Sequence, residues 1–75
     1  MARRMLLDVL AVGSRLGDRI VEAWAASRLG ELHEAAGWPG SAREYLTRAL
    51  RAWQFVANHP RSEEVRARLQ ALSGV

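Results

Sequence analysis

The four residues from Gly37 to Gly40 interrupt an otherwise helical pattern near the middle of this 75-residue chain. Glycine readily adopts the left-handed conformation that ends many helices, so Gly37 predicts the end of the preceding helix. Pro39 lacks an amide hydrogen and cannot continue that helix. Ser41 and Glu44 match a capping box, in which the two side chains bond to free amides at a helix start. The sequence therefore predicts a helical hairpin with its turn at 37–40 and its second helix starting at Ser41.

Upstream of this turn, apolar residues recur every three or four positions, which is the helical period. One such pattern runs from Arg19 to Ala36. Another stripe passes through Gly13 and comprises Leu6, Val9, Leu16, Ile20 and Trp24. Glycines at 13 and 17 permit close approach of a neighbouring helix but cost about 1 kcal/mol each relative to alanine. The segment from 5 to 24 is therefore either one long helix or two helices with a break near 14–18.

Downstream of the turn, a broad apolar face at helical spacing predicts a helix that ends near Asn58, because the residue before Pro60 is disfavoured in the α conformation. Ser62 is then expected to cap a last helix over about 62–73. We predict a single all-α domain over 1–75, an antiparallel bundle of three or four helices with a central hairpin over about 19–58. Met1 suggests a complete gene product.

The amino-acid composition indicates more apolar residues than a core of this size needs. Hydrophobic residues make up 49% of the chain and include three tryptophans, whereas a core of this size typically supplies only about 3–5 kcal/mol of stability. Cysteine is absent, which excludes disulfides, thiolate metal sites and cysteine nucleophiles. Oligomerisation is the remaining way to add stability, so we expect apolar surface to meet a second copy or another protein.

The formal charge is +3, and all eleven basic residues are arginine. Arginine is interspersed with glutamate, which favours a mixed solvated surface over a phosphate-binding face. The apolar run after Arg3 and Arg4 contains Asp8, is too short to span a bilayer and is not followed by a cleavage site. We expect no membrane span and a cytoplasmic location. An interfacial helix, with Arg15 and Arg19 beside its apolar stripe, is the weaker alternative.

No pattern in the chain indicates catalysis. The sequence lacks metal-binding, phosphate-loop and nucleophile-elbow motifs. His33 is expected to be a packing histidine and His59 a loop residue, since a catalytic or metal-binding histidine needs a second group to orient it. Glu44 and Arg48 are expected to form an ordinary surface ion pair. We therefore predict no enzyme activity, no cofactor and no metal site.

The tryptophans are the best indicators of contact. Trp24 and Trp53 lie on apolar stripes and are predicted to be in the core. Trp38 lies in the turn and is expected either to cover the hairpin end or to anchor a partner. The predicted partner-binding residues are Trp38, Tyr45, Trp53, Leu6, Val9, Leu16 and Ile20.

The run from Leu29 to Gly37, followed by Ala42, Leu46, Ala49 and Leu50, resembles a tetratricopeptide repeat (TPR). The resemblance covers roughly residues 26–53 and implies a protein-binding helical hairpin. In such a repeat, the small residues corresponding to Gly30, Ala42 and Ala49 let the two helices approach closely. His33, Leu46 and Pro39 depart from the family's aromatic preferences. No second copy occurs one repeat length away, although repeat proteins normally need about three.

Two other resemblances compete with this one. Trp38-Pro39-Gly40 is similar to the W-x-G turn of helical hairpins exported by ESX-type secretion systems. The run over 32–50 resembles a helix-turn-helix, which would bind DNA through Arg43, Arg48 and Arg51. The sequence favours a small protein-protein interaction module that self-associates, with DNA binding and export as the alternatives.

Overall fold

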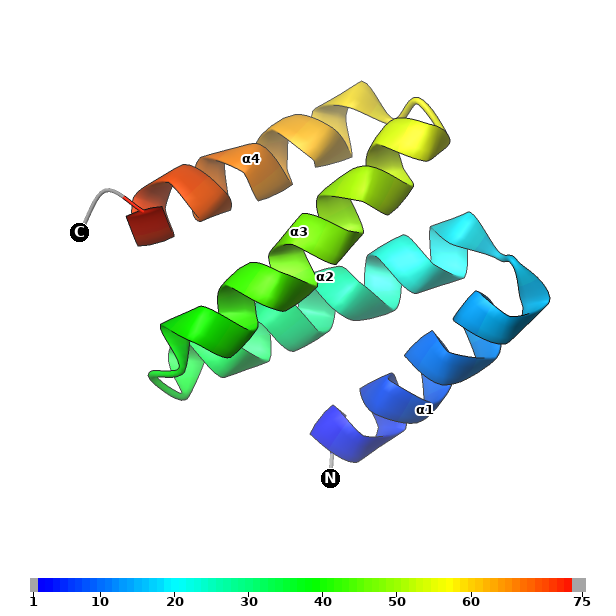
Figure 1. The fold of residues 1–75 in the computed structure, drawn as a ribbon, viewed down its shortest axis with the longest axis horizontal. Helices are drawn as coiled ribbons and strands as arrows, with labels where there is room; N and C mark the ends of the chain where they lie inside the picture. Colours follow the sequence, from blue (N-terminus) through cyan, green and yellow to red (C-terminus); the bar gives the residue numbers. More distant parts are fainter. Residues whose placement is uncertain (1, 74–75) are drawn as a thin grey trace.

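The computed structural model describes residues 2–73, which form four α-helices joined by three short turns (Figure 1). They are α1 (Ala2–Leu16), α2 (Arg19–Ala35), α3 (Pro39–Phe55) and α4 (His59–Ser73). Residues 2–73 contain no strand, so the all-α prediction is confirmed. The ends of the predicted domain, 1 and 74–75, lie outside the described residues. The open question at the N-terminus is settled, because α1 and α2 are separate helices.

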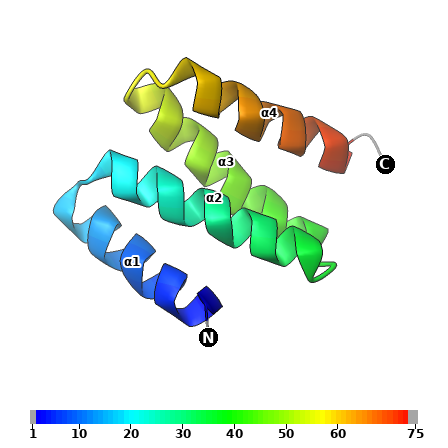
Figure 2. The same cartoon turned by 180° about the vertical axis from the view of Figure 1, so that it is seen from behind.

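The helices form an open, flat array rather than a closed bundle. Extensive packing joins only consecutive helices, and α2 with α3 is the most extensive pair. Figures 1 and 2 show α1 and α4 on opposite sides of this central pair. The array measures 36 × 30 × 14 Å along its principal axes. Each outer helix therefore packs extensively on one neighbour and leaves much of its circumference exposed.

The three turns share one backbone arrangement. The φ angle is positive at Gly17 (72°), Gly37 (81°) and Ala57 (56°). The amide of the next residue donates to a carbonyl in the last helical turn, as in the 2.8 Å bond from Trp38 N to His33 O. This bond is the signature of the Schellman motif. The predicted end of a helix at Gly37 is confirmed, whereas Ala57 adopts the left-handed conformation without being glycine.

The predicted capping box at Ser41 is wrong. α3 begins two residues earlier, at Pro39, and its N-cap is Trp38, which makes no side-chain cap bond. Proline is well suited to the first helical position, because its φ is already helical and the amide there needs no partner. Ser41 consequently lies within the first turn of α3.

The predicted cap at Ser62 is also wrong. α4 begins at His59, and Asn58 Oδ1 accepts a hydrogen bond from the Arg61 amide at 3.0 Å. Ser62 is buried and its hydroxyl donates to the Asn58 carbonyl at 2.8 Å. Proline at position 60 falls in the first turn of α4, where a missing amide is tolerated. The loop placement of His59 is wrong for the same reason.

Small residues bring the central helices together. Gly30 on α2 faces Leu46 on α3 so closely that an added Cβ would lie 2.6 Å from Leu46 Cδ2. Ala42 and Ala49 on α3 are fully buried, and so are Leu29 and Leu46. Gly13 plays the same part between α1 and α2, where an added Cβ would lie 2.9 Å from Val21 Cγ1. The core is thus concentrated along α2 and α3.

Candidate interaction surface

Large apolar side chains lie exposed along α1 and the start of α2. On α1 these are Met5, Val12 and Leu16, with exposed fractions of 66%, 43% and 74%. On α2 they are Ile20 and Trp24, at 59% and 46%. The prediction that Trp24 belongs to the core is therefore wrong. Trp24 belongs to a stripe with Leu16 and Ile20, and all three of these side chains stay exposed.

These side chains share one side of the molecule. Residues two positions apart on a helix point in nearly opposite directions, since each residue turns the helix by about 100°. Ser14 on α1 bonds to Arg48 of α3, so Val12 and Leu16 point away from α3. Glu22 on α2 also bonds to Arg48, so Trp24 points away from Arg48, and its exposed ring also lines a small pocket between α2, α3 and α4. We name Met5, Val9, Val12, Leu16, Ile20 and Trp24 the α1–α2 apolar face.

A polar network holds α1 in this position. The Glu22 carboxylate is buried and accepts hydrogen bonds from Arg48 Nε at 3.2 Å, Arg19 at 3.1 Å and the Ser14 hydroxyl at 3.2 Å. Arg48 also donates to the Ser14 hydroxyl at 2.7 Å. The network joins α1, α2 and α3. The predicted pair of Glu44 with Arg48 is wrong, because Arg48 points to Glu22 instead.

The network also sets the protonation of Glu22. Burial raises the pKa of its carboxyl group, but the hydrogen bonds from Arg48, Arg19 and Ser14 outweigh burial and hold the pKa below the ordinary value of 4.5. These bonds stabilise the ionised carboxylate selectively. Glu22 is therefore a structural anion that links three helices.

Trp38 and Tyr45 enclose His33 at the other end of α2. The His33 ring is buried and meets Trp38 and Tyr45 edge to face, with centroid distances of 5.3 and 5.0 Å. Arg3 of α1 lies over the Trp38 ring at 5.3 Å. Trp38 remains 47% exposed. It thus covers the hairpin end while one part of its ring stays open to solvent.

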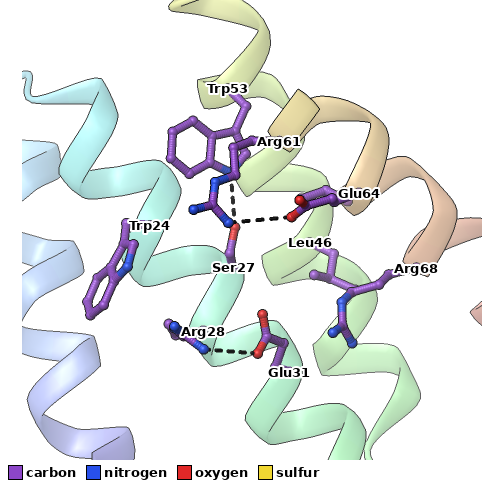
Figure 3. A pocket seen from close by; sticks show the side chains of 10 residues that line it. Trp24, Ser27, Arg28, Glu31, Leu46, Trp53, Arg61, Glu64 and Arg68 are labelled. Atoms are coloured by element: carbon purple, nitrogen blue, oxygen red, sulfur yellow. Dashed lines mark hydrogen bonds and ion pairs between the residues drawn. The ribbon is translucent and has the colours of Figure 1, made fainter. Parts of the chain in front are cut away.

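A small pocket opens between α2, α3 and α4 (Figure 3). Trp53 forms part of its wall and is buried, as predicted, with its indole nitrogen donating to the Ser27 hydroxyl at 3.1 Å. Three arginines line the pocket, and each pairs with a glutamate; the pairs are Arg28 with Glu31, Arg61 with Glu64 and Arg68 with Glu34. The cavity volume is about 100 Å³, below the roughly 300–1,000 Å³ typical of small-molecule sites.

The predicted partner-binding residues therefore lie in four places. Leu16 and Ile20 are exposed beside the α1–α2 turn, and Val9 is half-buried next to them. Leu6 packs against the core, facing α2. Trp38 and Tyr45 meet around His33, and Trp53 lines the pocket.

Sequence reasoning missed Met5 and Val12 as surface residues. Both lie on the apolar face of α1 with Leu16; Met5 is about three turns and Val12 about one turn before it. That spacing was readable in the sequence. Leu6 offers the same pattern on the neighbouring face, however, and only the position of α2 shows which face is covered.

Residues 2–73 contain no group of three potential metal ligands among His, Cys, Asp and Glu. None of the four described helices is long and apolar enough to cross a bilayer. Of the arginines that a helix-turn-helix would use, Arg43 and Arg51 are exposed but Arg48 is engaged with Glu22 and Ser14.

Comparison of the chain with protein-family models, with curated proteins and with solved structures found no match. The TPR resemblance therefore stays a prediction. The structure shows a close α2–α3 hairpin with small residues at the contact.

Proposed function

We propose that this chain is a small protein-interaction module that self-associates through the α1–α2 apolar face. The supporting observation is the concentration of large, exposed apolar side chains on one side of two adjacent helices. Soluble monomers rarely expose a contiguous apolar surface of this kind unless it contacts another molecule. Trp24 and the aliphatic residues beside it are side chains that contribute strongly when buried at interfaces.

The shape of the molecule supports the same proposal. α1 has extensive packing only on α2, so a second chain can reach its free side without displacing any other helix. The Glu22 network fixes α1 against α2 and α3, which presents the apolar face on a rigid support. A preorganised surface binds more tightly, because less conformational entropy is lost on association. The TPR-like character of the hairpin and the cytoplasmic location remain parts of this proposal that rest on the sequence.

Light scattering after size exclusion, across a tenfold range of concentration, tests the proposal. We expect a mass above 8.4 kDa that rises with concentration towards a dimer or a larger assembly. Leu16→Ser should weaken association because it removes an exposed apolar side chain from the face. Phe55→Ser is the matched control, since Phe55 is similarly exposed at 72% but lies at the end of α3. Arg19 lies 4.9 Å from the Phe55 ring centroid, so circular dichroism should also show that this variant keeps its helical content. A monomer at every concentration would contradict the proposal.

A further inference from the structure

The exposed residues of α1 have the spacing of a helix that pairs with another helix. Met5, Val9, Val12 and Leu16 are separated by four, three and four positions. This alternation is the seam of a heptad pattern, in which apolar side chains of two helices interlock. Val9 is half-buried with part of its side chain against the core, and the other three are exposed, so most of the seam is open. A helix that packs along it would cover all four side chains.

Two opposite charges lie along one edge of this seam. Asp8 and Arg15 are about two turns apart and therefore occupy equivalent positions beside the seam. Both side chains are exposed. Within residues 2–73 neither of them forms an ion pair. They are available to charges on another chain.

We infer that a second copy docks its α1 antiparallel on this seam, with Asp8 of each copy beside Arg15 of the other. This inference rests on the proposed self-association. In an antiparallel pair related by a two-fold axis, the same edge of each helix faces its equivalent. The register that places Asp8 beside Arg15 of the second copy also brings the apolar side chains of the two seams into contact. Leu16 then meets Met5 of the second copy, and Val9 meets Val12 of the second copy.

A parallel arrangement is disfavoured by the position of α2. Parallel helices pair one edge of the seam with the opposite edge of the partner helix. On α1 that opposite edge holds Leu6 and Gly13, which pack against the core and against α2 respectively. It carries no charge and is covered. In the antiparallel pair, the charged edges face each other, and Ile20 and Trp24 of each α2 extend the apolar contact on the other side.

Charge exchange tests the orientation directly. Asp8→Arg and Arg15→Asp each replace two attractive pairs with two repulsive ones, so each should weaken the dimer about tenfold or more. The double variant D8R/R15D restores both pairs in exchanged form and should return the dissociation constant to within about threefold of the unmodified chain. Sedimentation equilibrium at low and high salt measures these constants, and the single-variant effects should shrink at high salt.

Glu44→Arg and Arg43→Asp are the matched controls, because they cause the same changes of net charge on the exposed surface of α3. They should leave the dimer within about twofold of the unmodified chain. Circular dichroism checks that every variant keeps its helical content. A dimer that withstands both single exchanges, or that the double exchange does not restore, would overturn the antiparallel arrangement and leave self-association standing. A monomeric unmodified chain would overturn both.

Discussion

Gly30 on α2 packs directly against Leu46 on α3. A Cβ at Gly30 would lie 2.6 Å from Leu46 Cδ2 and 2.7 Å from Leu46 Cγ. Leu46 is fully buried, and making room for a Cβ would require its side chain to shift within a packed core beside the small pocket that it lines. The glycine therefore serves packing, although it weakens the helix locally relative to alanine.

Gly30→Ala is expected to destabilise the fold. Overpacking of a core costs about 1–3 kcal/mol, and the higher helix propensity of alanine offsets up to about 1 kcal/mol of this. We expect a net loss of about 1–2 kcal/mol in the free energy of unfolding, measured with urea. Gly40→Ala is the control, because a Cβ there meets nothing within 4 Å, and it should raise stability. Equal stability gains in both variants would contradict the packing role.

Glu22→Gln is expected to cost about 1–2 kcal/mol at neutral pH. The variant keeps the shape but loses charge-assisted bonds from Arg48 and Arg19, and this estimate is reduced because both arginine side chains are partly exposed. The pKa of Glu22 is lowered in the folded state, so its contribution is present above the ordinary carboxyl pKa of 4.5 and is lost as pH falls through the folded value.

Urea unfolding of the unmodified chain and of Glu22→Gln at pH 7 and pH 3 measures this dependence. The stability difference between them should be smaller at pH 3 than at pH 7. Glu63→Gln is a suitable control, since Glu63 pairs with Arg66 on the exposed surface of α4. A difference for Glu22→Gln that does not change with pH would show that the carboxylate charge is unimportant.

Exchanging glycine and alanine should change the stability of the fold in opposite directions at Gly37 and Ala57. Both residues have positive φ, at 81° and 56°, and this conformation costs an L-residue with a side chain roughly 1–2 kcal/mol. Gly37→Ala should lower the free energy of unfolding by about 1 kcal/mol. A Cβ there meets nothing within 4 Å, so the cost comes from the backbone alone.

Ala57→Gly should stabilise the fold by up to about 1 kcal/mol, because it relieves the same strain. Thermal unfolding of both variants, followed by circular dichroism, measures the two shifts. A loss of stability in Ala57→Gly would mean that the Ala57 methyl group makes a contact worth more than the strain.

Local sequence signals placed much of the secondary structure. The helical period identified the helical regions but left open whether the first of them is one helix or two. Gly37 marked the end of α2, because glycine lacks the Cβ that disfavours positive φ. The first residues of the helices were predicted less well. Ser41 and Ser62 are good capping residues, yet Pro39 and His59 begin their helices, since proline fits the first turn and the preceding Trp38 and Asn58 close Schellman turns.

The sequence by itself determined an all-α chain with a tight α2–α3 hairpin, because periodicity, glycine and proline act over a few residues. Only the tertiary structure decided which apolar residues are surface. Trp24 and Trp53 both lie on apolar stripes, but Trp53 is buried and bonds to Ser27 of α2, while Trp24 stays 46% exposed. The partner of Arg48 was likewise decided in three dimensions, because Glu22 comes within its reach only when α2 and α3 pack. Burial depends on which helices become neighbours, and helical spacing shows only which residues share a face.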